Sequence, residues 1–135
     1  MEKIKRKLDE LEEYTEILSM VSTYSKEDFM NNPIYYGGAE RFILLGYHNI
    51  LEASKLICEH CRFSNIHSKD IIKSLEINKV IPPWLVSNIN KRKKYIFTLK
   101  YDYLRLMNKE ELYFLLKDII SDFRHFKKYV LEYII

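Results

Sequence analysis

The stretch NKRKKYIFTLKYDYL, residues 90–104, carries the residue types in this chain that are best suited to chemistry. Four cations stand in succession from Lys91 to Lys94, and three tyrosines and a phenylalanine follow them. Cations bind phosphates and aromatic rings stack on unpaired bases, so the pattern suits RNA or a nucleotide. The stretch has no histidine, cysteine or serine, and its one carboxylate is Asp102. It therefore offers no nucleophile–base pair.

The spacing lets only part of this cluster meet one ligand. Four consecutive residues fan around most of a helix, whereas residues seven apart share a face. Lys93 then lies on one face with Lys100, and Lys94 lies on one face with Tyr101. By spacing alone a solvated helix end is the favoured interpretation, because charge runs on helices are common. The formal net charge of +3 is too small to indicate nucleic acid by itself.

The segment CEHC places two cysteines three residues apart, at Cys58 and Cys61, with His60 between them and His67 downstream. A structural zinc site usually combines two such clusters, and the chain has one. We expect both thiols to lie on one helix face as small hydrophobes. There is also no glycine loop that would hold phosphates, so we expect neither a metal nor a cofactor.

The elements that position these residues are predicted to be helices. Glycine and proline contribute three residues each, which disfavours a sheet protein because sheets need frequent turns. Hydrophobic residues make up 47% and charged residues 30% of the chain, which excludes a disordered protein. We expect one domain over residues 1–135, folded as an all-α, up-down bundle of four main helices plus short extra helices.

Apolar spacing and end signals give the predicted helices. The main ones cover residues 2–23, about 33–62, about 83–104, and the region from 108 onward, with short helices within 24–33 and 69–78. Ser25, Ser68 and Asn108 are the predicted caps, and Pro33 and Pro83 suit first turns. No apolar run is long enough to span a membrane, and the N-terminus lacks an apolar signal core, so we expect a cytoplasmic protein.

The second main helix is apolar on most of its sides. Such a helix needs neighbours all round, so it is either central in the chain or partly covered by a second subunit. Gly37, Gly38 and Gly46 each cost about 1 kcal/mol relative to alanine in a helix. These glycines are best explained if another backbone approaches closely.

Residues 14–57, YTEILSMVSTYSKEDFMNNPIYYGGAERFILLGYHNILEASKLI, resemble the HepT-like branch of the HEPN superfamily. Ser25-x-Glu-Asp-Phe followed by Asn32-Pro33 matches that branch's turn, GAER at 38–41 stands for its helix opening, and Glu52 falls at its acidic position. The segment IKSLEINKVIPPWLVSNINK, residues 72–91, is similar to the region that leads into the family's motif helix.

The resemblance implies an HEPN-like bundle that forms a homodimer through its central helices. It also implies a toxin-type ribonuclease encoded beside a nucleotidyltransferase-type antitoxin, which silences the toxin by attaching AMP to a tyrosine. Such ribonucleases cleave RNA without metal, at a motif of Arg, four to six residues, His, one residue and Tyr. The histidine is the general acid and base, and the arginine stabilises the phosphorane.

This chain departs from that motif at the histidine. If Tyr101 is the motif tyrosine, Leu99 occupies the histidine position and Arg92 or Lys94 supplies the cation. If Tyr103 is the match, Tyr101 occupies the histidine position. Leucine moves no proton, and a tyrosine with a pKa near 10 is a poor base. Loss of a general acid/base costs about 10²- to 10⁴-fold in rate.

The resulting hypothesis is a catalytically degenerate HepT-like component of a toxin–antitoxin pair that still binds RNA or a nucleotide. The binding candidates are Arg92, Lys94, Tyr101, Tyr103 and Glu52. One alternative is an active metal-independent endoribonuclease that uses non-standard residues, with His48 acting across the dimer. The other is a non-catalytic helical dimerisation module.

Overall fold

The computed structural model describes residues 1–100 and 108–135, and the side chains of 95 and 97–100 are not part of that description. These residues form six helices and no strand, which confirms the all-α class. The helices are α1 (Glu2–Val21), α2 (Lys26–Asn31), α3 (Pro33–His60), α4 (Ile71–Ile77), α5 (Pro83–Lys100) and α6 (Lys109–Ile134). The predicted spans agree to within two residues for the first two long helices. The predicted stretch from 101 to 104 lies outside the described residues.

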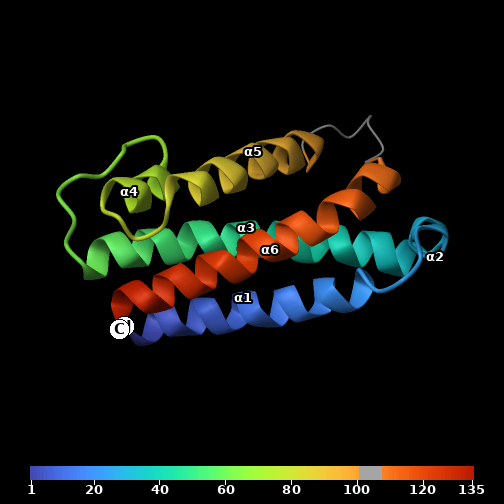
Figure 1. The fold of residues 1–135 in the computed structure, drawn as a ribbon, viewed down its shortest axis with the longest axis horizontal. Helices are drawn as coiled ribbons and strands as arrows, with labels where there is room; N and C mark the ends of the chain where they lie inside the picture. Colours follow the sequence, from blue (N-terminus) through green and yellow to red (C-terminus); the bar gives the residue numbers. More distant parts are fainter. Residues whose placement is uncertain (101–107) are drawn as a thin grey trace.

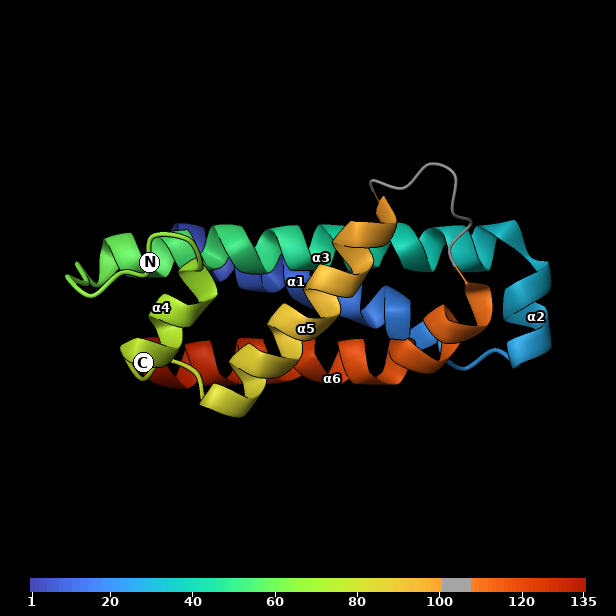
Figure 2. The same cartoon turned by 90° about the horizontal axis from the view of Figure 1, so that it is seen from above.

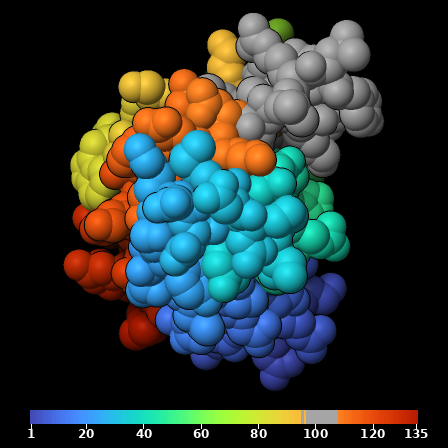
Figure 3. Space-filling view, turned by 90° about the vertical axis from the view of Figure 1, so that its right-hand side faces the viewer, coloured from blue at the N-terminus to red at the C-terminus, as the bar shows by residue number. Residues whose placement is uncertain are grey.

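Successive long helices run in opposite directions along the molecule, as Figure 1 shows for α1, α3, α5 and α6. Viewed from above in Figure 2, α5 crosses the other long helices obliquely. The short helix α2 closes one end and α4 lies toward the other. Figure 3 looks onto the α2 end, where atoms of α2 and of the start of α3 cover the centre of the face.

Local capping explains where several helices begin. The Ser25 side chain accepts a hydrogen bond from the Asp28 amide at 3.1 Å, and Pro33 sits in the first turn of α3. Asn108 accepts from the first-turn amides of α6, as predicted. The predicted cap of α4 is wrong: Ser68 lies before the helix, and Asp70 caps it by accepting from the Lys73 amide. Asp70 directly precedes the helix, so its carboxylate reaches a first-turn amide that has no partner within the helix.

Helix α3 occupies the centre of the fold. It packs against each of the five other helices, so neighbours within one chain cover most of its apolar sides. Ile43, Ile50 and Ile57, seven residues apart, are completely buried. Ile34 is the exception, at 79% exposed near the start of the helix. The central position of α3 within one chain therefore accounts for most of its apolar character.

The three glycines of α3 do not share one explanation. A Cβ at Gly46 would lie 2.3 Å from a ring carbon of Phe123, so α6 presses an aromatic ring, not a backbone, onto α3 there. A Cβ at Gly37 or Gly38 would meet no atom of residues 1–100 and 108–135 within 4 Å. Within that part of the chain, no backbone approaches closely enough to require glycine at these two positions.

None of the helices in the described residues is both long enough and apolar enough to cross a membrane. Their buried apolar side chains instead form one continuous cluster that draws on all six helices. Phe29 from α2, Leu75 from α4 and Ile89 from α5 join the long helices in it. This shared core fixes the position of α5, the helix that carries the cation cluster.

Candidate functional site

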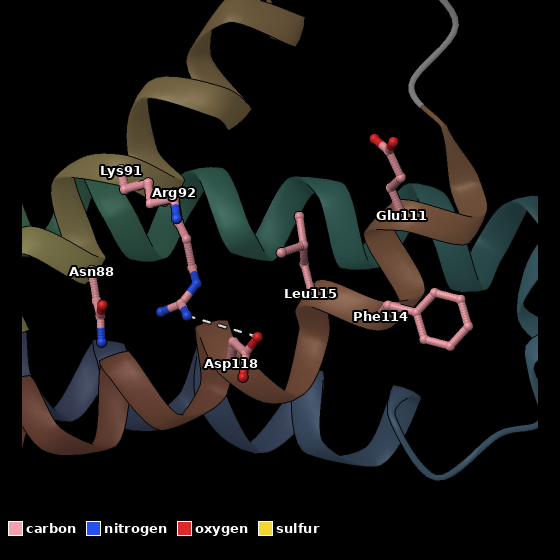
Figure 4. Close-up of a pocket in the computed structure, with 7 residues that line it drawn as sticks. All are labelled: Asn88, Lys91, Arg92, Glu111, Phe114, Leu115 and Asp118. Carbon is pink, nitrogen blue, oxygen red and sulfur yellow. Dashed lines mark ion pairs between the residues drawn. The ribbon is translucent and has the colours of Figure 1, made fainter.

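A cavity of about 510 Å³ opens between α5 and α6, and we call it the α5–α6 cavity. Its lining combines polar, charged and apolar side chains from the two helices, as Figure 4 shows: Asn88, Lys91, Arg92, Glu111, Phe114, Leu115 and Asp118. Its volume is in the range usual for small-molecule sites. Two of the four clustered cations thus line the same cavity as an aromatic and an aliphatic side chain of α6, although the Phe114 ring points away from them in Figure 4.

Arg92 is held inside this cavity by two carboxylates of α6. Its Nη1 donates a hydrogen bond to Asp122, and its Nη2 lies 3.7 Å from Asp118. Figure 4 shows the side chain reaching from α5 toward α6, with the ion pair to Asp118 dashed. The side chain of Asp122 is only 3% exposed and that of Arg92 22%. Arg92 therefore serves first to compensate a buried charge and to join two helices.

The surroundings of Asp122 perturb its protonation. Burial raises the pKa of the Asp122 carboxyl, while the hydrogen bond and the charge of Arg92 oppose that rise. Tyr47 of α3 lies next to this pair, and burial followed by the charge of Asp122 raises the pKa of its phenol. The Tyr47 hydroxyl is buried and has no hydrogen-bond partner among the described residues. The cluster is a polar island in the core where three helices meet.

The remaining cations of the cluster point to different environments. Lys91 and Lys94 are exposed, whereas Lys93 is half-buried. Lys91 lines the α5–α6 cavity and has no carboxylate or aromatic partner within the part of the chain that the structure describes. Leu99 belongs to α5, but its side chain is not described, and Tyr101 and Tyr103 lie outside the described residues.

Glu52 takes part in a separate network on the other side of α3. One oxygen lies 2.5 Å from Nζ of Lys7 on α1, and the other lies 2.9 Å from Nε2 of His48. The hydrogen bond from Lys7 is the main reason that the pKa of Glu52 is lowered, and it also raises the pKa of Lys7. Glu52 and Arg92 share no cavity lining, so one chain does not bring these two predicted residues together.

The histidines differ in their exposure. The side chain of His48 is 65% exposed and is oriented by Glu52. His125 is half-buried, and its ring lies edge-on to Trp84 and stacks with Tyr129. His60 is exposed at the end of α3. Of the three, only His48 combines exposure with a carboxylate that holds its ring.

The two cysteines fit the interpretation as small hydrophobes in part. Cys58 is buried in the core, and Cys61 is half-buried at the C-cap of α3. Burial is the largest cause that raises the pKa of each thiol, which disfavours the reactive thiolate form. Within residues 1–100 and 108–135 no three metal-ligating side chains gather in one place.

The carboxylates that hold Arg92 are not among the site residues predicted from the sequence. Asp122 follows Ile119 by three residues and precedes Phe126 by four, so it lies on the apolar face of α6. A carboxylate on a buried helix face requires a cationic partner, and Arg92 is the arginine in the facing cluster. The charged side chain of Asp122 on an otherwise apolar helix face is therefore the sequence signal for an ion pair between α5 and α6.

Comparison with known proteins assigns the chain to no family. No family model matches it, and no curated protein matches it significantly. The resemblance of residues 14–57 to HepT-like proteins accordingly stays a prediction.

Proposed function

We propose that this chain is a HepT-like HEPN component of a toxin–antitoxin pair. In this proposal it forms a homodimer, binds a nucleotidyltransferase-type antitoxin, lacks the motif histidine, and holds RNA or a nucleotide in the α5–α6 cavity. The observation that carries the binding proposal is the meeting of Lys91 and Arg92 with Phe114 in one cavity. An antiparallel arrangement of long helices is consistent with the fold that the resemblance implies.

Each lining residue has a definable part in such binding. Lys91 is exposed at the cavity and available to a phosphate. Phe114 is 61% exposed, and a base that stacks on its ring would share the ring with Lys26, whose Nζ lies over it at 5.6 Å from the centroid. Asp118 is exposed and accepts hydrogen bonds, which suits a base amino group or a ribose hydroxyl. Arg92 positions the two helices and contributes charge without being the main ligand contact.

Replacing Lys91 with alanine is the sharpest test of binding, because Arg92→Ala would also disturb the core. We expect weaker binding of single-stranded RNA, and a plot of log affinity against log salt that is shallower by about 0.7, since one phosphate contact is lost. Lys5→Ala is the matched control, because Lys5 is an exposed cation on α1. Fluorescence anisotropy at several salt concentrations measures both. Identical slopes for the two variants would exclude Lys91 from the site.

An active endoribonuclease is the second candidate, and the His48–Glu52 pair favours it. A carboxylate 2.9 Å from Nε2 orients the ring and leaves Nδ1 free to accept a proton, which is the arrangement of a general base. His48 is exposed on α3, near Arg41 and Leu45 in helical spacing. This candidate requires that the second subunit of the proposed homodimer bring its own cavity to that surface.

Incubation of the purified protein with total RNA tests this candidate. If His48 is the base, His48→Ala lowers cleavage by about 10²-fold or more, while His60→Ala, an exposed histidine of the same helix, leaves it unchanged. Absence of cleavage by the unaltered protein would reject the enzyme. Absence of RNA and nucleotide binding as well would leave the helical dimerisation module, with co-purification of a nucleotidyltransferase as the test of partnership.

A further inference from the structure

A second cavity, of about 360 Å³, lies between the end of α1 and the middle of α6, and we call it the α1–α6 cavity. Hydroxyls and positive charges dominate its lining, over the buried side chain of Ile120: Ser19, Ser22, Lys117, Ser121, Arg124 and His125. No carboxylate of the described residues lines it. The α5–α6 cavity, in contrast, includes Glu111 and Asp118.

The two cations of this cavity differ from the other basic residues of α6. Lys127 pairs with Glu12 at 2.9 Å, and Lys109 and Lys128 lie over tyrosine rings. Lys117 and Arg124 are seven residues apart and hence on one face, and neither has a carboxylate partner in the described part of the chain. The single polar contact of Arg124 there is a long one, 3.4 Å from its Nη2 to Oγ of Ser19.

These cations lie beside the C-terminus of α1, and they would have a structural explanation if they capped its last carbonyls. Those carbonyls already have donors. The Ser22 amide bonds to the Leu18 carbonyl at 2.9 Å, and the Ser22 hydroxyl donates to the Ser19 carbonyl at 2.7 Å. The carbonyls of Met20 and Val21 accept from the next two backbone amides. Capping of the C-terminus of α1 therefore does not explain the positions of Lys117 and Arg124.

Two serine hydroxyl protons in the same cavity have no acceptor among the residues that the structure describes. The Ser19 oxygen accepts from Arg124, so its own proton is available. Nδ1 of His125 lies 2.8 Å from the Ser121 carbonyl, a contact that requires Nδ1 to carry the proton. The Ser121 hydroxyl, 3.2 Å from the same nitrogen, then points its proton elsewhere. The cavity thus offers two charges and two hydroxyl protons to one acceptor.

We propose that the α1–α6 cavity binds the phosphate group of a small phosphorylated molecule. Arginine binds two oxygens of a phosphate through parallel hydrogen bonds, and lysine adds a point charge. Serine hydroxyls can donate to a third phosphate oxygen. The volume suits a small ligand. This site uses residues 117, 121 and 124 of α6, whereas the α5–α6 cavity uses 111, 114 and 118, so the two stand independently.

Calorimetric titration with inorganic phosphate, AMP and uncharged adenosine at constant ionic strength tests the proposal. We expect phosphate and AMP to bind and adenosine not to bind; tighter binding of AMP than of phosphate would show that the nucleoside contributes. The Lys117→Gln/Arg124→Gln double variant should lose about tenfold or more in phosphate affinity. Lys5→Gln/Lys128→Gln removes the same charge from exposed positions outside the cavity and should change the affinity less than about twofold.

Amide chemical shifts give a second measurement that does not depend on the double variant folding. Phosphate should shift the amides of Ser19 and Ser121 in the unaltered protein, and Ser121→Ala, which keeps every charge, should weaken binding several-fold. Equal phosphate affinity of the two double variants would overturn the proposal. So would shifts confined to α5, or binding of adenosine as tight as that of AMP.

Discussion

Replacing Arg92 with methionine is expected to lower the free energy of unfolding by about 3–5 kcal/mol, because it leaves a buried carboxylate without its partner. Asp122 is 3% exposed, and the guanidinium of Arg92 is the cation bonded to it. Urea denaturation followed by circular dichroism measures the loss. Lys91→Met is the matched control: it removes an exposed cation one residue away and should change stability by less than about 0.5 kcal/mol.

A second substitution separates loss of charge balance from loss of packing. Arg92→Met combined with Asp122→Leu removes both charges, and it should recover most of the stability, since apolar replacements of buried ion pairs are often neutral. If the single variant is as stable as the control, Asp122 is already protonated or hydrated in the native protein. In that case Arg92 is free to serve a ligand.

The pH dependence of the stability of Arg92→Met follows from the pKa of Asp122. Burial raises that pKa and Arg92 opposes the rise, so the pKa climbs further when Arg92 is removed. A carboxyl with a raised folded-state pKa binds its proton more readily in the native than in the unfolded protein. Its favourable contribution is complete below the unfolded-state pKa, about 3.9, and is lost as pH increases through the folded-state pKa. The stability gap between Arg92→Met and the unaltered protein should therefore narrow as the pH is lowered.

Gly46→Val is expected to destabilise the fold by about 1–3 kcal/mol, because α3 and α6 have no room for a side chain there. A Cβ would lie 2.3 and 2.4 Å from two ring carbons of Phe123, which is completely buried and edge-on to Tyr47. The ring cannot swing aside without displacing that neighbour. Thermal unfolding measures the cost, and adding Phe123→Leu should restore part of it.

Gly37→Ala is the control within the same helix. A Cβ there meets no atom of the described residues within 4 Å, so alanine should stabilise α3 by up to about 1 kcal/mol through helix propensity. If Gly37→Ala instead weakens self-association in sedimentation experiments, the second copy of the proposed homodimer packs against this part of α3. An unchanged Gly46→Val protein would mean that α3 and α6 lie further apart than the ring contact indicates.

Local signals gave most of the fold. The apolar residues recur every three to four positions, and the caps at Ser25 and Asn108 bond to amides within the next turn. Both signals can therefore be recognised without knowing the tertiary structure. The predicted N-cap of α4, Ser68, lies two residues from the observed one, Asp70, because serine and aspartate are both favoured N-cap residues. The apolar sides of α3 left open a central position in the chain, cover by a second subunit, or both, and the packing of the other five helices against α3 shows the first.

The candidate site was predictable only in part. The sequence marks the cation cluster on α5, but the direction of each side chain depends on what faces it. Arg92 turns inward because Asp122 is buried opposite, whereas Lys91 remains at the surface. The α1–α6 cavity had no local signal at all. Its serines and cations come from segments about a hundred residues apart, at Ser19 and Arg124.

The sequence by itself determined an all-α protein, the positions of its helices, and a cluster of positive charge on the fifth. Period and capping are short-range properties, which is why they can be recognised in one chain. Only the tertiary structure decided which cation pairs with a buried carboxylate, and at which glycine a side chain would clash. It also decided which hydroxyls and charges share a cavity. Those outcomes depend on contacts between helices that are distant in sequence, where burial makes an unpaired charge or a misplaced methyl group costly.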